Sequence, residues 1–458
     1  MSTTAFFMMN TRRTFLAVVA SLVAASSAAL LGTDSFAQSP ADVKVWIAFT
    51  DNRLDWTREK AAEFNKQFPQ YNVTVEGYGN YEEIQQATDL AIQQNAAPAV
   101  VQWFEVGTQR ARDFGYFKSI ADALGERTEV NGIPVNFDDF IQPVVSYYTL
   151  DGKFTSMPWN SSSPILYSNT AILKKAGIET PPATWQEVEA ACEKIMALAD
   201  APQGCITWPN HGWFYEQWMA QQNAILANNQ NGRLKRATRL FLDSEPSVAI
   251  ASWWQSMEDK GYYVYSGRQR DWAATEQAIQ TGTVAMAITS SADAANITNA
   301  AKENKIDIVT SRMPYNADMG WTGNLIGGAS LWLVKDLPKE VEEGALSFML
   351  WLNNTENAAE WHKVTGYLPI RESSVELLEK EGWFKENPNF FTASDQINNS
   401  TVTIATRGAL LGSFPQTRDV ITQTMEDLML KGGDPEEAMI KANERANQLL
   451  AEYNSLYN

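Results

Sequence analysis

Hydrophobic and polar positions along the first part of the chain follow a repeated strand and helix order. Residues 43–49 alternate as in a half-buried strand, and residues 54–68 carry apolar side chains at helical spacing. The same order recurs at 71–75, 81–94 and 97–104, which we predict as strand, helix and strand. This order predicts an α/β fold of mainly parallel sheets flanked by helices, with any ligand beyond the carboxyl ends of the strands.

Further apolar runs predict strands at 165–169, 284–289 and 306–313, and most of 372–458 has a helical pattern. The stretch 324–334 is predicted as a buried strand that two consecutive glycines interrupt. Because glycine lacks a Cβ, another backbone or a ligand can come close to it, and its peptide N–H groups stay open to an acceptor. A β-bulge in a core strand is the alternative that this stretch leaves open.

Two helix starts lie next to candidate binding residues. Thr184 and Glu187 have the spacing of a capping box, which places Trp185 in the first helical turn. The Trp185 ring can then point away from the helix toward a ligand, or pack on its own helix. Ser290 and Ser291 follow an apolar strand, and helix starts of this kind bind anions readily.

Length and charge narrow the class of protein. A chain of 458 residues exceeds what one hydrophobic core usually supports, so we expect two domains. Acidic residues outnumber basic ones by 54 to 36, and no Lys/Arg stripe alternates with aromatic residues. Nucleic acid and anionic membrane surfaces are therefore poor partner candidates. The 16 tryptophans suit either a core or a sugar-like ligand.

The N-terminal segment 1–37 has the features of a twin-arginine export signal. Arg12 and Arg13 precede an alanine-rich apolar run, and small residues at 35 and 37 predict cleavage after Ala37. A permanent N-terminal anchor is the alternative. No cysteine ends the segment, so we expect an exported protein in the periplasm without a lipid anchor.

Only two cysteines, Cys192 and Cys205, are present. In an oxidising compartment two cysteines that flank a short loop favour a structural disulfide. A metal site would need more ligands than these cysteines and the distant His211 and His362 supply. We expect neither a metal nor another cofactor.

Five segments occur in order along nearly the whole chain after residue 37. They are EVGT at 105–108, NSS at 160–162, IGGASLW at 326–332, NAAEWH at 357–362 and TGYLPI at 365–370. Together these segments resemble the extracellular solute-binding family of ABC importers, which also includes maltose-binding proteins. Within that family they are most similar to the branch that binds glycerol-3-phosphate.

The resemblance implies a two-lobed periplasmic-binding-protein fold of type II with the ligand in the cleft between the lobes. Lobe one would hold 43–154 and 306–366, and lobe two 155–305 and 367–458. It implies a monomer that captures glycerol-3-phosphate or a glycerophosphodiester and delivers it to the membrane permease of an ABC importer. The alternative within the family is a sugar or an oligosaccharide.

The resemblance also supplies a set of candidate ligand residues, which would come from both lobes. In this set Arg418, hydroxyl groups and the Gly328 N–H would donate to phosphate, Glu105 would accept from glycerol hydroxyls, and Trp185 would cover the carbon skeleton. The alternative for Arg418 alone is a surface ion pair. The candidate ligand residues are Tyr81, Glu105, Ser162, Trp185, Ser290, Gly328, Tyr367 and Arg418.

Two segments depart from the family pattern, and both would border the cleft. They are the strand exit 48–52 and the loop that carries Trp208, Trp213 and Trp218. A bulkier diester or a sugar is therefore a plausible ligand. An exported phosphodiesterase or glycosidase is the competing class, but the chain has no G-x-S-x-G, phosphate-loop or H-E-x-x-H motif and only two histidines. These features favour a binding protein over an enzyme.

Overall fold

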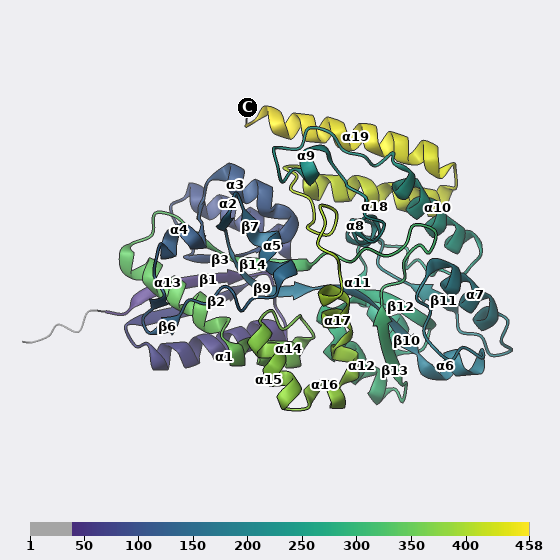
Figure 1. Cartoon of the computed structure of the whole chain (residues 1–458), viewed down its shortest axis with the longest axis horizontal. Helices are drawn as coiled ribbons and strands as arrows, with labels where there is room; N and C mark the ends of the chain where they lie inside the picture. The colour runs from purple at the N-terminus through teal and green to yellow at the C-terminus, as the bar shows by residue number, and fades with distance from the viewer. Residues whose placement is uncertain (1–38, 458) are drawn as a thin grey trace, which may run out of the picture. The chain divides into compact units, whose positions relative to one another are not determined.

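The computed structural model describes residues 39–457, and Pro40–Asn458 form one compact unit (Figure 1). The predicted export signal 1–37 and its cleavage site lie outside the described residues. Among the residues described, none of the helices combines the length and apolar character that crossing a membrane requires.

The first of two large sheets has the strand order β2-β1-β3-β14-β4, and β9 also pairs with β14. The periodicity of the first hundred residues is confirmed here, since its predicted strands and helices appear in the expected order. The strands of this sheet are β1 (Ala41–Ile47), β2 (Tyr71–Gly77), β3 (Val100–Phe104), β4 (Phe117–Lys118), β9 (Met157–Ser162) and β14 (Gly327–Val334).

The second sheet has the order β11-β12-β10-β13, and two short hairpins, β5-β6 and β7-β8, stand apart from both sheets. Its strands are β10 (Pro164–Asn169), β11 (Gly204–Thr207), β12 (Val284–Ser290) and β13 (Ile308–Arg312). The hairpin strands are β5 (Glu129–Val130), β6 (Ile133–Pro134), β7 (Thr149–Leu150) and β8 (Lys153–Phe154).

The sheets are mixed, so the prediction of mainly parallel pairing was wrong on this point. Parallel pairs join β1 to β2 and β3, and β11 to β12. Strand β14 runs antiparallel to β3, β4 and β9, and β10 runs antiparallel to both of its neighbours. The parallel pairs are joined by crossover helices. The antiparallel pairs involve β9, β10, β13 and β14, which are not successive members of such units. Strand β13 pairs in the second sheet although the sequence prediction placed 306–366 in lobe one.

Helices cover the sheets, and their apolar residues form two large buried clusters. One cluster surrounds β1 and α13 (Lys339–Leu352), and the other surrounds α8, α10 (Glu245–Asp259) and α18 (Phe414–Lys431). Helix α18 and helix α19 (Pro435–Ser455) lie side by side near the C-terminus (Figure 1). The helices of the N-terminal half are α1 (Asn52–Gln67), α2 (Tyr81–Gln93), α3 (Thr108–Phe114), α4 (Ile120–Leu124), α5 (Gln142–Tyr148), α6 (Thr170–Lys175), α7 (Trp185–Met196), α8 (Gly212–Gln221) and α9 (Asn228–Asn231).

The remaining helices include the long C-terminal pair and three short 3₁₀ turns, of which η1 and η2 directly follow β3 and β12. They are α10 (Glu245–Asp259), α11 (Trp272–Gln280), α12 (Ala294–Glu303), α13 (Lys339–Leu352), α14 (Thr355–Thr365), α15 (Glu372–Lys380), α16 (Trp383–Glu386), α17 (Thr392–Asn398), α18 (Phe414–Lys431), α19 (Pro435–Ser455), η1 (Glu105–Gly107), η2 (Ser291–Asp293) and η3 (Pro388–Phe390).

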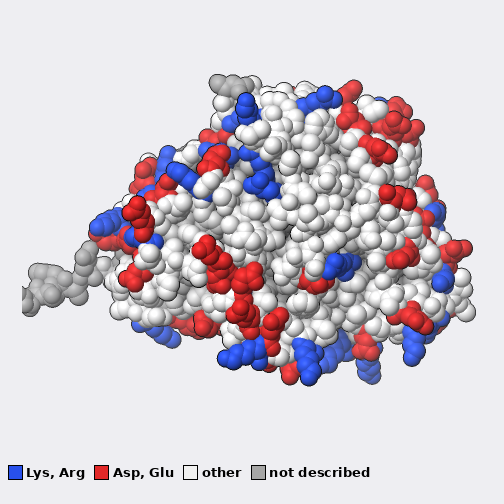
Figure 2. Space-filling model, in the orientation of Figure 1, with Lys and Arg blue, Asp and Glu red and all other residues white. Residues whose placement is uncertain are grey.

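Acidic and basic side chains are interspersed on the face of the described chain that Figure 2 shows, and no continuous basic stripe crosses that face. This distribution agrees with the acidic composition of the whole sequence, which has a formal net charge of −18. A mixed surface of this kind gives no electrostatic footprint for nucleic acid on the face shown.

Candidate functional site

A cavity of about 690 Å³ lies where strands of the first and second sheets end. Glu105 directly follows β3, Ser290 ends β12, Ser162 ends β9, and Gly328 lies at the start of the antiparallel strand β14. Strand ends of an α/β fold are where ligands commonly bind. Every candidate ligand residue except Trp185 lines this cavity, namely Tyr81, Glu105, Ser162, Ser290, Gly328, Tyr367 and Arg418.

The glycine stretch contains both features that the sequence left open. The register of β14 against β9 shifts between Ala329 and Ser330, as at a β-bulge. Gly328 has φ of 100°, and a Cβ placed there would lie 1.9 Å from the carbonyl oxygen of Asn160. A Cβ on Gly327 would lie 2.4 Å from the Trp213 ring. Only glycine therefore allows β14 to approach β9 and the ring this closely.

A hydrogen-bond chain fixes the Tyr81 hydroxyl in the cavity wall. Gln102 donates from Nε2 to Asn160 Oδ1 over 2.9 Å, and Asn160 donates from Nδ2 to the Tyr81 oxygen over 2.9 Å. The Tyr81 ring stacks on Phe104 with ring centroids 5.3 Å apart. Burial raises the pKa of Tyr81 well above its usual value, so the phenol stays neutral. Because its oxygen already accepts from Asn160, its own proton is available for a ligand acceptor.

Arg418, at the start of α18, lies between two buried carboxylates. Its Nε donates to Glu216 Oε1 over 2.5 Å, and its Nη2 donates to Glu216 Oε2 over 2.9 Å and to Glu105 Oε1 over 2.8 Å. The side chains of Glu105 and Glu216 are only 5% and 3% exposed. Burial raises the pKa of Glu105, and the Arg418 charge opposes that shift. Arg418 thus forms a buried ion pair, and the alternative interpretation of a surface ion pair was wrong.

The cavity also contains polar residues that the sequence reasoning did not assign. Arg53 lies over the Phe49 ring at 4.3 Å, and Asp293 lies at the end of η2. Burial raises the pKa of Asp293 to about 6, while the Arg53 charge lowers it. The only sequence signal for this corner was the departure of segment 48–52 from the family pattern.

His211 and Trp213 of the tryptophan loop also line the cavity, together with Trp272 at the start of α11. His211 caps α8, where its Nδ1 accepts from the Trp213 backbone N–H over 2.9 Å. Burial first, and then the charges of Arg418 and Arg270, lower the pKa of His211 well below its usual value. The ring is therefore neutral, as an acceptor at a helix start requires.

Trp185 does not line the cavity in the described structure. The predicted capping box of Thr184 and Glu187 is present, and it starts α7 at Trp185. The ring stacks on Trp253 with centroids 4.6 Å apart and planes within 6°, and it meets the edge of Trp218. Among the residues described, its Nε1 has no hydrogen-bond partner. The ring packs inside the buried aromatic cluster because the large apolar surfaces of its neighbours lie on that side of the helix start.

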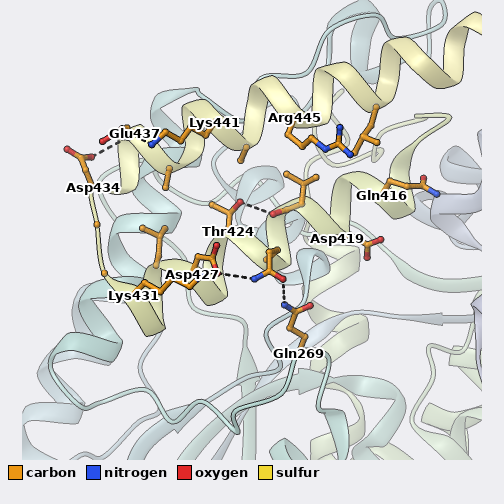
Figure 3. Close-up of a pocket in the computed structure, with 18 of the residues that line it drawn as sticks. Gln269, Gln416, Asp419, Thr424, Asp427, Lys431, Asp434, Glu437, Lys441 and Arg445 are labelled. Atoms are coloured by element: carbon orange, nitrogen blue, oxygen red, sulfur yellow. Dashed lines mark hydrogen bonds and ion pairs between the residues drawn. The ribbon is translucent and has the colours of Figure 1, made fainter.

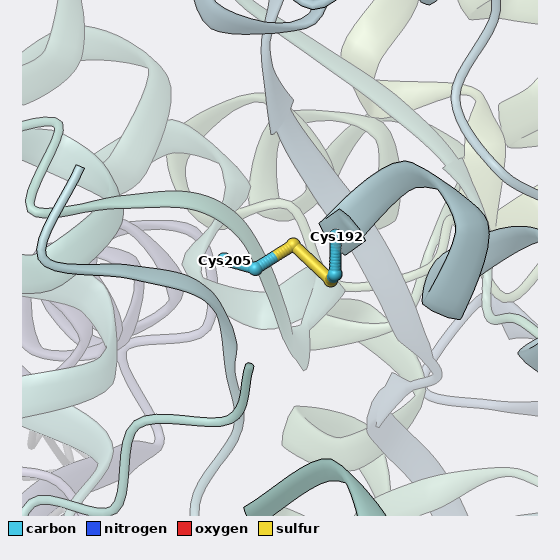
Figure 4. Close-up of a disulfide and its surroundings, with 2 residues drawn as sticks. All are labelled: Cys192 and Cys205. Carbon is cyan, nitrogen blue, oxygen red and sulfur yellow. A yellow bond between two sulfur atoms is a disulfide. The ribbon is translucent and has the colours of Figure 1, made fainter. Parts of the chain in front are cut away.

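Cys192 of α7 and Cys205 of β11 form a disulfide, with their Cα atoms 5.3 Å apart (Figure 4). Both residues are fully buried. The bond joins α7 to the second sheet within the same aromatic cluster, so it stabilises that wall of the fold. Within residues 39–457, no cluster of three or more His, Cys, Asp or Glu side chains is placed to bind a metal ion.

A second hollow of about 860 Å³ lies along α18 and α19 (Figure 3). Charged side chains of both signs line it, among them Asp419, Asp427 and Lys441. None of the predicted ligand residues, all of which belong to the described part of the chain, lines this hollow. Arg270 lines both hollows and lies between them.

Comparisons with known proteins identify the family to which the chain belongs. Residues 59–392 match the model of the bacterial extracellular solute-binding protein family. The sn-glycerol-3-phosphate-binding periplasmic protein of Escherichia coli (strain K12) is 32% identical over 432 residues, which are 93% of this chain and 95% of that protein. The corresponding protein of Salmonella paratyphi A is 34% identical over 402 residues, which are 86% of this chain and 89% of its own length.

Solved structures show the same fold at lower identity. The crystal structure of UgpB from Mycobacterium tuberculosis in complex with glycerophosphocholine has a TM-score of 0.73 at 22% identity, and covers 91% of this chain and 99% of its own. The sugar-binding protein MalE of Xanthomonas citri has a TM-score of 0.73 at 17% identity with the same coverage. The chain therefore belongs to the bacterial extracellular solute-binding protein family and has its two-lobed α/β fold.

Proposed function

We propose that this protein captures glycerol-3-phosphate or a glycerophosphodiester in the 690 Å³ cavity and delivers it to the permease of an ABC importer. One observation carries the proposal above the others. Residues that the sequence connected to glycerol-phosphate binding, from segments as distant as Tyr81 and Arg418, converge on one cavity. The names of the relatives in Escherichia coli and Salmonella support the same ligand class.

The wall chemistry matches a phosphorylated polyol. The cavity wall offers neutral hydroxyl donors from Ser162, Ser290 and Tyr367, and Gly328 adds a backbone segment without a side chain. Burial raises the pKa of Tyr367, which keeps its proton in place for a phosphate oxygen. Glu105 accepts from glycerol hydroxyls while Arg418 holds its carboxylate in position. Charge-assisted bonds of this kind are the strong ones in anion binding.

We place the hinge of the capture step between the two lobes that the sequence predicted, with two changes of boundary. The segment 155–162 goes to lobe one with β9, and 306–313 goes to lobe two with β13. Glu105 belongs to lobe one and Arg418 to lobe two, so the cavity wall has contributions from both. A ligand that contacts both lobes stabilises the closed arrangement relative to the open one. Export by segment 1–37, a monomeric state and the absence of turnover complete the proposal.

Calorimetry with the purified protein tests the function. We expect saturable binding of glycerol-3-phosphate or glycerophosphocholine, and a ligand at 100 times its Kd stabilises the fold by about 2.7 kcal/mol. Mass spectrometry after incubation should recover intact ligand. Binding of maltose with no response to either phosphate compound would refute the ligand class, and release of free glycerol-3-phosphate from the diester would reveal an enzyme.

A further inference from the structure

Three arginines line the cavity, and they differ in how far their charges are already neutralised. Arg418 faces two buried carboxylates, and its Nε and Nη2 are both used on them. Two carboxylates around one guanidinium leave no excess positive charge at this end of the cavity. Arg418 therefore holds Glu105 in place better than it attracts a phosphate, which needs a second cation.

The Nε and Nη2 of Arg53 are both used on one carboxylate, that of Asp51, which is 47% exposed. Its Nε donates to Asp51 Oδ1 over 2.9 Å, and its Nη2 donates to Asp51 Oδ2 over 2.5 Å, so it forms a fork with a carboxylate two residues away. Asp293 lies close enough to influence it as well. Two acids thus offset the Arg53 charge in its corner of the cavity.

Arg270 is in a different situation. Its two salt-bridge partners, Glu82 at 3.7 Å and Asp419, are 52% and 59% exposed, so water already weakens both pairs. Its buried Nε–H has no hydrogen-bond partner among the residues that the structure describes. A buried charged donor without a partner is costly unless another group completes its hydrogen bonding.

The backbone at Arg270 is unusual too. Arg270 has φ of 57°, in the left-handed region that arginine rarely adopts. Its N–H donates to the carbonyl of Asn210 over 3.0 Å, and its carbonyl accepts from the Trp272 N–H over 3.0 Å. These bonds hold the residue in the strained conformation directly before α11. Strain of this kind clusters at ligand clamps, and here it directs a long cationic side chain to the cavity.

We propose that Arg270 is a specificity-determining residue that binds the anionic oxygen of the ligand in the cavity through its free Nε–H. The assignment rests on the proposed function, because it concerns the phosphate of that ligand. The phosphate takes the place of weak, exposed carboxylates and does not have to break a buried pair.

Arg270→Asn is the test variant, because asparagine accepts a left-handed backbone without a large penalty. We expect its affinity for dianionic glycerol-3-phosphate at pH 8 to fall at least about tenfold, which corresponds to about 1.4 kcal/mol. The loss for the monoanionic glycerophosphocholine should be smaller. Arg270→Lys keeps the charge but not the planar fork, so its affinity should lie between those of Arg270→Asn and the wild type.

Arg268→Asn is the matched control. Arg268 lies two residues away, pairs with Asp271 at 2.6 Å and does not line the cavity, yet its removal changes the net charge by the same amount. Its affinity for both ligands should equal that of the wild type. An equal loss in Arg268→Asn would overturn the assignment, because it would show a long-range field effect.

The remaining outcomes are also distinct. Unchanged affinity in Arg270→Asn, or an equal loss for both ligands together with a lower melting temperature, overturns the role of Arg270 and leaves the proposed function standing. If the wild type binds neither phosphate compound, the proposed function and the assignment both fail. A charge-selective loss in a variant that melts like the wild type supports the assignment.

Discussion

Replacing Arg418 by methionine should lower the free energy of unfolding even in the absence of a ligand. The substitution removes the guanidinium and leaves Glu105 and Glu216, which both accept from its Nη2, facing each other in a buried site. Removing one partner of a buried ionic cluster costs about 3–5 kcal/mol. Because the total free energy of unfolding of a protein is about 5–15 kcal/mol, this cost is a large fraction of it.

The removal of a second charge should restore part of the loss. Glu216→Gln in the Arg418→Met background eliminates the repulsion between the two carboxylates, and the glutamine amide is close in size and shape to the carboxylate that it replaces. We expect the double variant to be more stable than the sum of the single effects by about 1–3 kcal/mol, measured by urea unfolding. Strict additivity within about 0.5 kcal/mol would refute the reasoning.

The pH dependence gives an independent check on the same variant. Burial already raises the pKa of Glu105, and the loss of Arg418 raises it further. A carboxyl with a raised pKa destabilises the fold above that pKa, and the penalty disappears as the pH falls toward the ordinary value near 4.3. The deficit of Arg418→Met should therefore shrink between pH 7 and pH 5. A constant deficit would show that lost packing, and not charge, causes it.

Three further substitutions test the geometry. Trp185→Ala should lower the free energy of unfolding by about 3–5 kcal/mol in urea, while calorimetry shows unchanged ligand affinity; a tenfold affinity loss would mean that the ring contacts ligand. Gly328→Ala should cost more than about 1 kcal/mol, because φ is 100° there; an unchanged melting temperature would contradict this conformation. Burial raises the pKa of Asp293 to about 6, against the Arg53 charge, so its contribution to stability is lost as the pH rises from about 4 to 6. Asp293→Asn should flatten that part of the melting-temperature profile, and an unaltered slope would exclude the carboxyl as its source.

Local sequence signals predicted those parts of the fold that depend on neighbouring residues. Alternation and helical spacing were enough to identify β1, α1, β2, α2 and β3, because each element buries one face against the next. The capping box at Thr184 was equally local. The glycine stretch predicted both a strand and a close backbone approach. The structure has both, since only a residue without Cβ fits beneath the carbonyl of Asn160.

The rest depended on tertiary contacts that no local pattern encodes. Trp185 has the same sequence signal whether its ring meets a ligand or packs on Trp253, and the aromatic cluster decides between them. The direction of β14 depends on how the chain returns from the second sheet. Arg53 and Arg270 lie in ordinary polar segments, and only the fold brings both to the cavity that Tyr81 and Glu105 also line.

The charges around the cavity also bear on how far a ligand can drive closure. On the proposed lobe boundaries, the buried pair of Glu105 with Arg418 and the exposed pair of Glu82 with Arg270 both connect the lobes. Such pairs hold the lobes together without ligand, and a ligand shifts the equilibrium only by its differential affinity for the closed state. In the buried pair Arg418 is already hydrogen-bonded to Glu105 and Glu216, so a phosphate gains little charge attraction there. At the exposed pair a phosphate can replace the Glu82 carboxylate on Arg270, and it favours closure when the same ligand also contacts lobe one, for example at Tyr81.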